Sequence, residues 1–408
     1  MNEESETQRF GEMIEILTGF PFKSTSYTDD INDTRLLRGD NIGQGQLDWE
    51  NAKRWPVGES NNLDKYHLLE GDIVLAMDRP WIEAGLKYAV IQKSDLPCLL
   101  VQRVARIRPK NEYDSRFITA LIDSWDFTHY ILNVQTGTAV PHISSRQISE
   151  YKVPKVGKTN QKRIAINRGL FDSKISVNKL ISETTFEIIE ALFRSWFIYF
   201  DPVREKSEGV STYGMNEEIA ALFPVSFENS ELGPIPVGWK VKKIGDLIER
   251  LKVGKKYDQW TVQKKGKVPV LDQGKKGIIG YHNDAPGVTA SLERPVVIFC
   301  NHTCLMKLIS HPFSAIQNVL PFEGKGVNTT WTYFATRGKQ EFTGYKGHWP
   351  DFIVHKLVVP PEDLTNKFGQ VVENLLASID QTSNEENYCE SIRDFLLPRM
   401  ISGEFSFS

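Results

Sequence analysis

The sequence contains few cysteines and no long apolar run. Its 408 residues include four cysteines, Cys98, Cys300, Cys304 and Cys389. So few thiols at these spacings do not suggest a disulfide framework, and free, buried thiols are expected instead. The longest apolar runs are far shorter than a membrane span requires, and the first ten residues carry neither the basic nor the apolar part of a secretory signal. The sequence therefore predicts a cytoplasmic protein without a membrane partner.

Two sequence motifs of nucleotide and methyl-transfer enzymes are also missing. No G-x-x-x-x-G-K-[ST] phosphate-binding loop is present, which argues against an ATPase. No N/D-P-P-Y/F tetrapeptide of the amino-methyltransferases is present either, since residues 283–286 read NDAP. Glu70 and Asp72 could belong to a nuclease site, but Asp72 follows a glycine at a position typical of a turn-capping aspartate. We therefore predict that the chain is not an enzyme and has no catalytic residue.

One cluster offers the ligand types of a zinc site, namely Cys300, His302, Cys304 and His311. Its C-x-H-x-C spacing is tighter than the usual C-x₂₋₄-C. In a strand, residues 300, 302 and 304 would share one face, which is compatible with a site or with simple packing. No second ligand pair stands at zinc-finger spacing, so we predict no metal.

The net charge of −3 argues weakly against a protein that coats DNA alone, but the charge is unevenly spread. Between Lys240 and Gly280 there are twelve Lys or Arg and four Asp or Glu, a surplus of eight positive charges. A local basic patch of this kind attracts phosphate. A solvated, lysine-rich surface is an equally good interpretation from charge alone.

The chain contains two similar halves. Residues 10–15 read FGEMIE and residues 244–249 read IGDLIE, and each half closes with a Val-Pro element, at 153–154 and 359–360. The bodies over about 8–155 and 237–361 are rich in short apolar runs bounded by Gly, Pro, Asn or Asp, which predict strands. Helical spacing near 115–131 adds helix, so each body is expected to be α+β.

A long helix is predicted after each body. Residues 160–200 contain no proline, and the next one is Pro202. About 40 helical residues at about 1.5 Å each would extend about 60 Å. The second helix is predicted over about 363–397, with Pro398 ending it as Pro202 ends the first. In each predicted helix, apolar residues at helical spacing form one stripe, from Ile164 to Trp196 in the first and from Phe368 to Leu396 in the second. Both apolar stripes turn polar in the middle, at residues such as Asn178 and Thr382, which weakens a coiled coil but can fix its register. The helices could pack antiparallel on each other, or each could pack on its own body.

Several segments, in order along the chain, resemble the specificity subunit of Type I restriction–modification systems. The resemblance rests on five motifs: LEGDIV at 69–74, TGTAVPHI at 136–143, LFRSWF with FDPV at 192–203, GPIPVGW at 233–239, and RDFLLPRMISG at 393–403. Each motif alone is weak, but five in order on a duplicated plan are specific. The second body departs from the pattern, because it has GYKGHWP at 344–350 where the family has a G-T-x-x-x-x-I loop.

The resemblance implies an α+β fold with two similar mixed α/β target-recognition domains, separated by two long, antiparallel, coiled-coil-like helices. The predicted parts are the first recognition domain (1–155), the central helix (156–202), a linker (203–236), the second recognition domain (237–361) and the C-terminal helix with its tail (362–408). It further implies that each domain binds one half of a bipartite, asymmetric double-stranded DNA site, while the helices set the spacer. Two methyltransferase subunits would dock on the helices and bind S-adenosylmethionine. Restriction subunits would add ATP- and Mg²⁺-dependent translocation and cleavage, as in phage defence.

DNA recognition requires phosphate anchors and a few side chains that pair with base edges. An arginine such as Arg79 can pair with guanine O6 and N7, although a surface ion pair with Asp78 is equally plausible, and Asn301 can pair with adenine. The remaining candidates lie on glycine- or proline-bounded loops, or next to probable strands. The first-body candidates are Lys23, Ser24, Arg79, Thr138, His142, Ser144 and Arg146. The second-body candidates are Tyr257, Gln273, Lys275, Lys276, Tyr281, Asn301, His302, Thr303 and Lys346.

Three classes of function remain open from the sequence. The first is a DNA-recognition subunit of a complete restriction–modification complex, or an adaptor of a related methyltransferase system without restriction. The second is an enzyme with its own nuclease or methylase activity, which the missing motifs disfavour. The third is a protein-binding scaffold whose bodies no longer recognise DNA.

Overall fold

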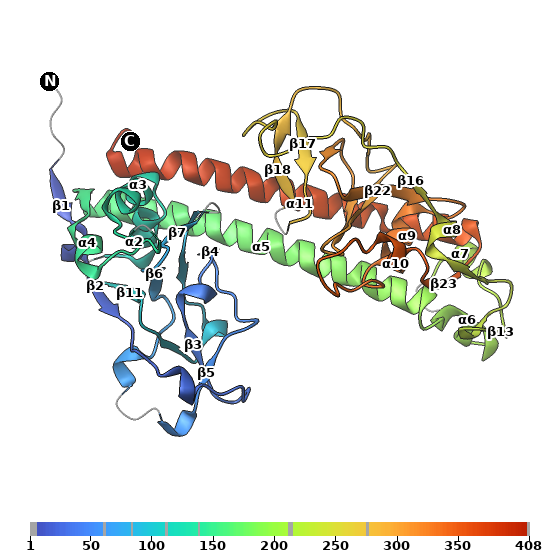
Figure 1. Cartoon of the computed structure of the whole chain (residues 1–408), viewed down its shortest axis with the longest axis horizontal. Coiled ribbons are helices and arrows are strands. Elements are labelled where there is room, and N and C mark those ends of the chain that lie inside the picture. Colours follow the sequence, from blue (N-terminus) through green and yellow to red (C-terminus); the bar gives the residue numbers. More distant parts are fainter. Residues whose placement is uncertain are drawn as a thin grey trace. The chain divides into compact units, whose positions relative to one another are not determined.

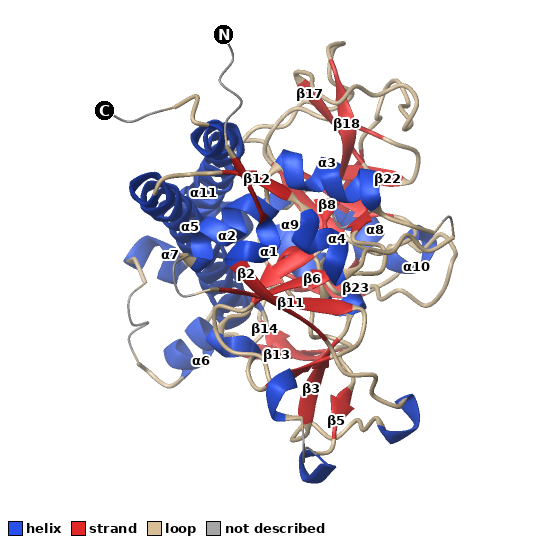
Figure 2. Ribbon diagram, turned by 90° about the vertical axis from the view of Figure 1, so that its left-hand side faces the viewer, coloured by secondary structure: helices blue, strands red, loops and turns tan. Residues whose placement is uncertain are grey.

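A computed structural model describes residues 6–59, 63–82, 85–110, 113–137, 139–210, 215–274 and 277–405. The chain divides into two compact units. Unit 1 comprises Met1–Val177 with Glu385–Ser408, and unit 2 comprises Asn178–Asn384. Each unit mixes helices and strands (Figures 1 and 2), as the α+β prediction requires. No helix in the described part of the chain combines the length and apolar character needed to cross a bilayer.

Unit 1 is built around a five-stranded sheet in the order β2-β11-β6-β9-β4. Its strands are β2 (Ile14–Thr18), β11 (Val104–Pro109), β6 (Ile73–Ala76), β9 (Tyr88–Val90) and β4 (Gln44–Gly45). The central strand β6 is apolar and buried at every residue, because both of its faces are covered. It runs antiparallel to β11 and to β9.

Smaller elements complete unit 1. A three-stranded sheet has the order β10-β3-β5, and two strand pairs are β1–β12 and β7–β8. These strands are β10 (Cys98–Leu100), β3 (Thr34–Leu37), β5 (Arg54–Trp55), β1 (Thr7–Arg9), β12 (Lys152–Pro154), β7 (Trp81–Ile82) and β8 (Gly85–Leu86). The helices are α1 (Phe10–Met13), α2 (Ser115–Ile122), α3 (Trp125–Val134) and α4 (Ser145–Glu150). The single helical segment predicted near 115–131 is thus two helices, since Ser124 accepts a hydrogen bond from the Phe127 N–H and caps α3.

Unit 2 repeats this plan. A four-stranded sheet has the order β16-β22-β19-β20, a three-stranded sheet β18-β17-β21, and two pairs are β15–β23 and β13–β14. These strands are β16 (Ile248–Arg250), β22 (Val319–Gly324), β19 (Val296–Cys300), β20 (Met306–Ile309), β18 (Ile278–His282), β17 (Val268–Leu271), β21 (Ser314–Ala315), β15 (Lys240–Lys243), β23 (Lys356–Val359), β13 (Phe227–Ser230) and β14 (Gly233–Pro236). The helices are α6 (Asp201–Ser207), α7 (Glu217–Ala221), α8 (Ile244–Leu247), α9 (Thr329–Thr336) and α10 (Trp349–Phe352).

The duplication predicted from the sequence is present in the backbone. In unit 1 the Phe10 N–H donates to the Tyr151 oxygen at 2.8 Å, and in unit 2 the Ile244 N–H donates to the His355 oxygen at 2.9 Å. Each bond ties the short FGEMIE- or IGDLIE-type helix to the residue before the Val-Pro strand. The two motifs therefore close their units in the same way.

Two long helices, α5 (Lys158–Phe197) and α11 (Glu362–Ser402), pass through both units and pack on each other. Within unit 1, Lys174 pairs with Glu385 at 2.7 Å. Within unit 2, the Ser182 and Thr382 hydroxyls share a hydrogen bond of 2.6 Å. Asp172 contacts Arg393 while Lys174 contacts Glu385 in unit 1, and Ser182 contacts Thr382 while Phe193 contacts Phe368 in unit 2. Residue numbers thus fall along α11 as they rise along α5, so the helices are antiparallel, as predicted. The polar middle of the stripes pairs across the seam, because the Asn178 amide also donates to the Thr382 carbonyl at 3.4 Å.

The ends of the long helices differ from the prediction. Pro202 does not end α5: that helix ends at Phe197, Phe200 adopts a left-handed φ of 57°, and Pro202 lies in the first turn of α6, where its missing N–H costs nothing. Pro398 lies inside α11, which continues to Ser402. The last turn survives the loss of one backbone bond because Leu397, Met400 and Ile401 are buried in the core of unit 1.

Residues 203–236, which the composition predicts to be a linker, contain secondary structure. They include most of α6, all of α7 and the hairpin β13–β14. Val203, Phe223 and Ile235 are at most 4% exposed and join the core of unit 2. Many of the Gly, Ser, Pro and Asn residues that suggested a linker lie in these short helices and strands or in the turns between them, which are held by these buried apolar side chains.

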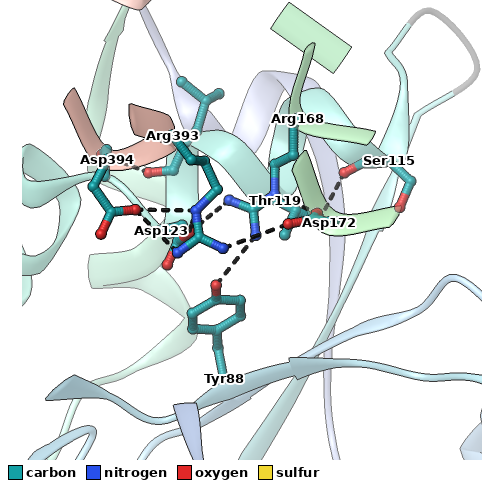
Figure 3. A network of polar contacts seen from close by, with 10 residues as sticks. Tyr88, Ser115, Thr119, Asp123, Arg168, Asp172, Arg393 and Asp394 are labelled. Atoms are coloured by element: carbon teal, nitrogen blue, oxygen red, sulfur yellow. Dashed lines mark hydrogen bonds and ion pairs between the residues drawn. The ribbon is translucent and has the colours of Figure 1, made fainter. Parts of the chain in front are cut away.

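A buried network of charges attaches both long helices to the body of unit 1 (Figure 3). Arg168 of α5 is 4% exposed and pairs with Asp123 at 2.6 Å and Asp172 at 3.1 Å. Arg393 of α11 reaches the same two carboxylates at 3.9 and 3.5 Å, and the Tyr88 hydroxyl accepts a bond of 3.4 Å from Arg168. Burial alone would raise the pKa of the Asp123 carboxyl, but the guanidinium groups of Arg168 and Arg393 outweigh that effect and lower it.

Candidate nucleic-acid interface

The central strand of unit 1 ends in a three-residue bulge, Met77–Arg79. The Ala76 N–H donates to the Lys87 oxygen at 3.0 Å, and the Lys87 N–H donates to the Pro80 oxygen at 2.7 Å. Lys87 therefore bonds to the residues on either side of the bulge, Ala76 and Pro80. Within the described part of the chain, no backbone hydrogen bond joins residues 77–79 to the strand that contains Lys87. Bulges of this kind redirect side chains at the edges of sheets.

The loop over 136–143, which the sequence assigns to closing the domain, holds this bulge in place. The Met77 carbonyl accepts from the Ile143 N–H at 2.9 Å, and the Arg79 N–H donates to the Pro141 oxygen at 2.7 Å. The loop is itself closed by two backbone bonds between Thr136 and His142, of 2.7 and 2.8 Å. Thr138 lies outside the described residues. The structure thus places Arg79 and His142 on two segments that are bonded to each other through their backbones.

Asp78, at the centre of the bulge, pairs with Arg103 at 2.5 Å and with the His142 Nδ1 at 2.6 Å. Partial burial would raise the pKa of the Asp78 carboxyl, but its hydrogen bonds with Arg103 and His142 outweigh this effect and lower it. The alternative in which Asp78 forms an ion pair with Arg79 is therefore wrong. Arg79 is exposed, with a left-handed φ of 44°.

The other first-body candidates have more ordinary surroundings. Ser144 caps α4, since its hydroxyl accepts from the Gln147 N–H at 3.2 Å. Arg146 pairs with Glu150 one turn further along α4, at 2.8 Å. Lys23 and Ser24 are exposed at the start of a 3₁₀ turn over Ser24–Ser26. Ser144 is thus a structural cap, whereas Lys23 and Ser24 remain available to a ligand.

Asp72 has the turn-capping role expected of it. Its carboxylate accepts from the Leu69 N–H at 2.8 Å and from Arg108 at 2.7 and 2.9 Å. Because the side chain is 2% exposed and fully engaged, it is not a nuclease ligand.

Unit 2 has the same arrangement at the end of its own central strand β19. Cys300 pairs with Val319 on β22 as Ala76 pairs with Val104 on β11. The Asn301 carbonyl then accepts from the His348 N–H at 2.9 Å, as the Met77 carbonyl accepts from Ile143. The segment over 344–350, which departs from the family pattern, therefore occupies the position of the first-body closing loop.

Five second-body candidates meet at this position. The Gln273 side chain accepts from the His302 N–H at 2.9 Å, and its carbonyl accepts from the Thr303 hydroxyl at 3.0 Å. The His302 Nδ1 lies 2.9 Å from the Lys346 carbonyl. The fifth is Asn301, while Lys275 and Lys276 lie outside the described residues. Sequence reasoning missed Tyr345, which is 91% exposed and stacks on the His302 ring at 5.2 Å.

Asn301 has a structural role. Its side-chain oxygen accepts from the Trp349 N–H at 2.9 Å, which fixes the start of α10 and the loop before it. The Asn301 amide thus binds protein where the sequence suggested an adenine.

Replacing Asn301 with alanine tests this assignment. We expect N301A to destabilise unit 2 by about 1 kcal/mol, as the loss of a helix-capping side chain does. Thermal unfolding measures the loss, and T303A, a change at the exposed neighbour, is the control. Equal stability of N301A and T303A would contradict the capping role.

The remaining second-body candidates lie on or near β18. Tyr257 is 6% exposed, stacks on His282 at 4.2 Å and donates its hydroxyl to Asp284 at 3.2 Å. Lys255 pairs with Asp284 at 2.9 Å. Tyr281 is half-buried within β18. Tyr257 is therefore a packing residue.

The possible zinc cluster does not have strand geometry. β19 ends at Cys300, and the chain turns so that the Cys304 N–H donates back to the Cys300 carbonyl at 2.8 Å. Burial raises the pKa of the Cys300 thiol to about 11, which disfavours the thiolate a metal needs. Among the described residues, no three His, Cys, Asp or Glu side chains gather closely enough to hold a metal.

Comparison with known proteins shows what the sequence resembles. Residues 2–183 match the family model described as Type I restriction modification DNA specificity domain. The EcoAI specificity subunit of Escherichia coli is 39% identical over 157 residues, which are 38% of this chain and 26% of that protein. The MjaIX specificity subunit of Methanocaldococcus jannaschii is 23% identical over 347 residues, which are 79% of this chain and 76% of that protein. The chain is thus similar to Type I restriction–modification specificity subunits, and its residues 2–183 match their DNA specificity domain.

A solved structure has a similar fold. The S subunit of a Type I restriction–modification system from M. genitalium is matched over 100% of this chain and 98% of its own, with a TM-score of 0.52 and 15% identity. The chain spans about a quarter of the EcoAI subunit and 41% of the MjaVIII subunit, to which it is 30% identical. The family resemblance and the fold class predicted from the five motifs are therefore confirmed.

Proposed function

We propose that this chain is the DNA-specificity subunit of a Type I restriction–modification complex. Each unit would bind one half of a bipartite, asymmetric DNA site. The observation that carries the proposal is the duplicated arrangement at the ends of β6 and β19, where a closing loop is bonded to the residue after each central strand. Polar side chains meet there in both units, yet they differ in chemistry between the two. Two similar supports with different side chains suit an asymmetric site.

The proposal extends to the partners. Two methyltransferase subunits would dock along α5 and α11, whose exposed apolar side chains include Leu170, Leu180 and Ile188. The methyltransferase subunits would supply S-adenosylmethionine chemistry, and restriction subunits would supply ATP- and Mg²⁺-dependent steps. The chain itself would be non-catalytic, and the length of the helix pair would set the unread spacer.

Genome-wide mapping of methyladenine tests the proposal. In cells with the gene and its methyltransferase partners, we expect methylation at one bipartite motif, and deletion of the gene should abolish that motif alone. A methylation map that does not change on deletion would overturn the proposal. Methyl transfer or DNA cleavage by the purified chain alone would overturn its non-catalytic part.

A further inference from the structure

Beyond the bulge of unit 1, the chain forms a short β-ribbon that has no counterpart at the matching position, residues 301–304, of unit 2. Its strands β7 and β8 pair Trp81 with Leu86 and Ile82 with Gly85. Trp81 and Ile82 are 38% and 41% exposed, whereas Leu86 is 6% exposed and belongs to the core. In unit 2 the corresponding connection is a tight turn, because the Cys300 N–H already donates to the Leu305 oxygen at 2.8 Å. The ribbon is therefore an addition specific to one body.

Arg79 stands at the base of this ribbon and is held by its backbone alone. Its N–H is bonded to Pro141, and Pro80, the next residue, is bonded to Lys87. A φ of 44° is unfavourable for a residue with a side chain, so the surrounding bonds must impose it. Among the described residues, no carboxylate lies within ion-pair distance of the Arg79 guanidinium, since the adjacent Asp78 is bound to Arg103 and His142.

We propose that Arg79 and the β7–β8 ribbon recognise guanine in the half-site bound by unit 1, with Arg79 donating to guanine O6 and N7. This inference rests on the proposed function. A two-stranded ribbon fits the major groove of B-DNA, and a planar guanidinium pairs with guanine by two parallel hydrogen bonds. The exposed side chains of Trp81 and Ile82 provide apolar surface suited to a neighbouring thymine methyl group.

The ion pairs of Asp78 leave the Arg79 guanidinium free to bind a base. A free carboxylate beside Arg79 would compete with the base for the guanidinium and would repel the DNA backbone. Arg103 and His142 bind both oxygens of that carboxylate, at 2.5 and 2.6 Å. The bulge thus presents an arginine while it neutralises the adjacent acid.

Unit 2 presents different chemistry at the matching position. The residue that corresponds to Arg79, counted from the Cys300–Val319 pair, is Thr303, and its hydroxyl is bonded to Gln273. Tyr345 and His302 stack there instead of an arginine. We therefore expect the arginine–guanine contact in one half-site only.

Two substitutions at Arg79 test the inference in the complete methyltransferase complex. R79G removes the side chain and suits the left-handed backbone, while R79K keeps the charge without the planar fork. We expect the preference of both variant complexes for guanine, at one position of one half-site, to fall by about tenfold or more. The bases that they require in the other half-site should be unchanged. R9K, the same charge-conserving change at an exposed arginine of β1, serves as the control and should retain the full motif.

A second measurement separates base recognition from phosphate binding. Cognate duplexes with 7-deazaguanine at that position lack the N7 acceptor, so the wild-type complex should bind them about tenfold or more weakly, and the R79G complex should not distinguish them. A uniform loss of methylation with an unchanged motif would assign Arg79 to a phosphate and overturn the inference. A motif without guanine in the unit 1 half-site would also overturn it. If the proposed function itself fails, the wild-type chain will direct no motif at all.

Discussion

Replacing Arg168 with alanine should destabilise unit 1 by about 3 kcal/mol. The change leaves Asp123 and Asp172 without their main cation, and the Asp123 side chain is only 22% exposed. Removing one partner of a buried ion pair costs about 3–5 kcal/mol. We expect the lower end of this range because Arg393 stays 3.9 Å from Asp123 and still partly balances its charge. Native-state hydrogen exchange of α2 and of the unit 1 part of α5 measures the effect within unit 1.

K174A is the matched control for R168A. Lys174 lies on the same helix and pairs with Glu385 of α11, but its side chain is 51% exposed. Solvent screens an exposed pair, so K174A should leave the exchange pattern nearly unchanged. The buried network, rather than helix pairing in general, is expected to stabilise unit 1. Equal changes in hydrogen exchange for R168A and K174A would contradict this expectation.

The same network has a pH dependence of known sign. Because the folded-state pKa of Asp123 lies below its usual value, the contribution of this carboxylate is complete above the ordinary aspartate pKa of about 3.9. It is lost as the pH falls through the lower, folded-state pKa. We therefore expect D123N to be less stable than the wild type at neutral pH and to show a weaker loss of unit 1 stability under acid.

Local patterns in the sequence predicted the local elements well. The apolar stripes located α5 and α11 to within a few residues at their starts, since periodicity depends on neighbours three and four positions apart. The continuation of α11 past Pro398 could not be predicted in this way. It depends on the burial of Met400 and Ile401 against a body that lies far away in the sequence. Tertiary packing overrode the local preference there.

The candidate interface shows the same division. Arg79 and His142 could be chosen from loop composition, but the role of Arg103 could not, because it precedes β11 and meets Asp78 only in the fold. Asn301 has a residue type suited to adenine, yet its oxygen binds Trp349 from a segment some 48 positions away. No sequence pattern marked Tyr345 as a site residue, apart from the glycine next to it. The bulge itself is a backbone feature, set by bonds to Pro141 and Lys87 that no local pattern encodes.

Replacing Phe368 with alanine should destabilise unit 2 by about 3–5 kcal/mol, the usual cost of removing a fully buried aromatic ring. Phe368 of α11 is 0% exposed. Its ring centroid lies 5.4–6.0 Å from four other rings, namely those of Phe193, Trp196, Phe197 and Phe334. The first three belong to α5, so this ring joins the two long helices within unit 2.

F395A makes the same change on the same helix at a side chain that is 53% exposed, and it should lower stability far less. Hydrogen exchange of α9 and of the unit 2 part of α5 follows the core directly. Because bodies and helices share this core, F368A should also weaken methylation at the motif without altering its bases. A changed motif in F368A would mean that the core tunes base recognition, and a stability equal to that of F395A would show that the helices are held together elsewhere.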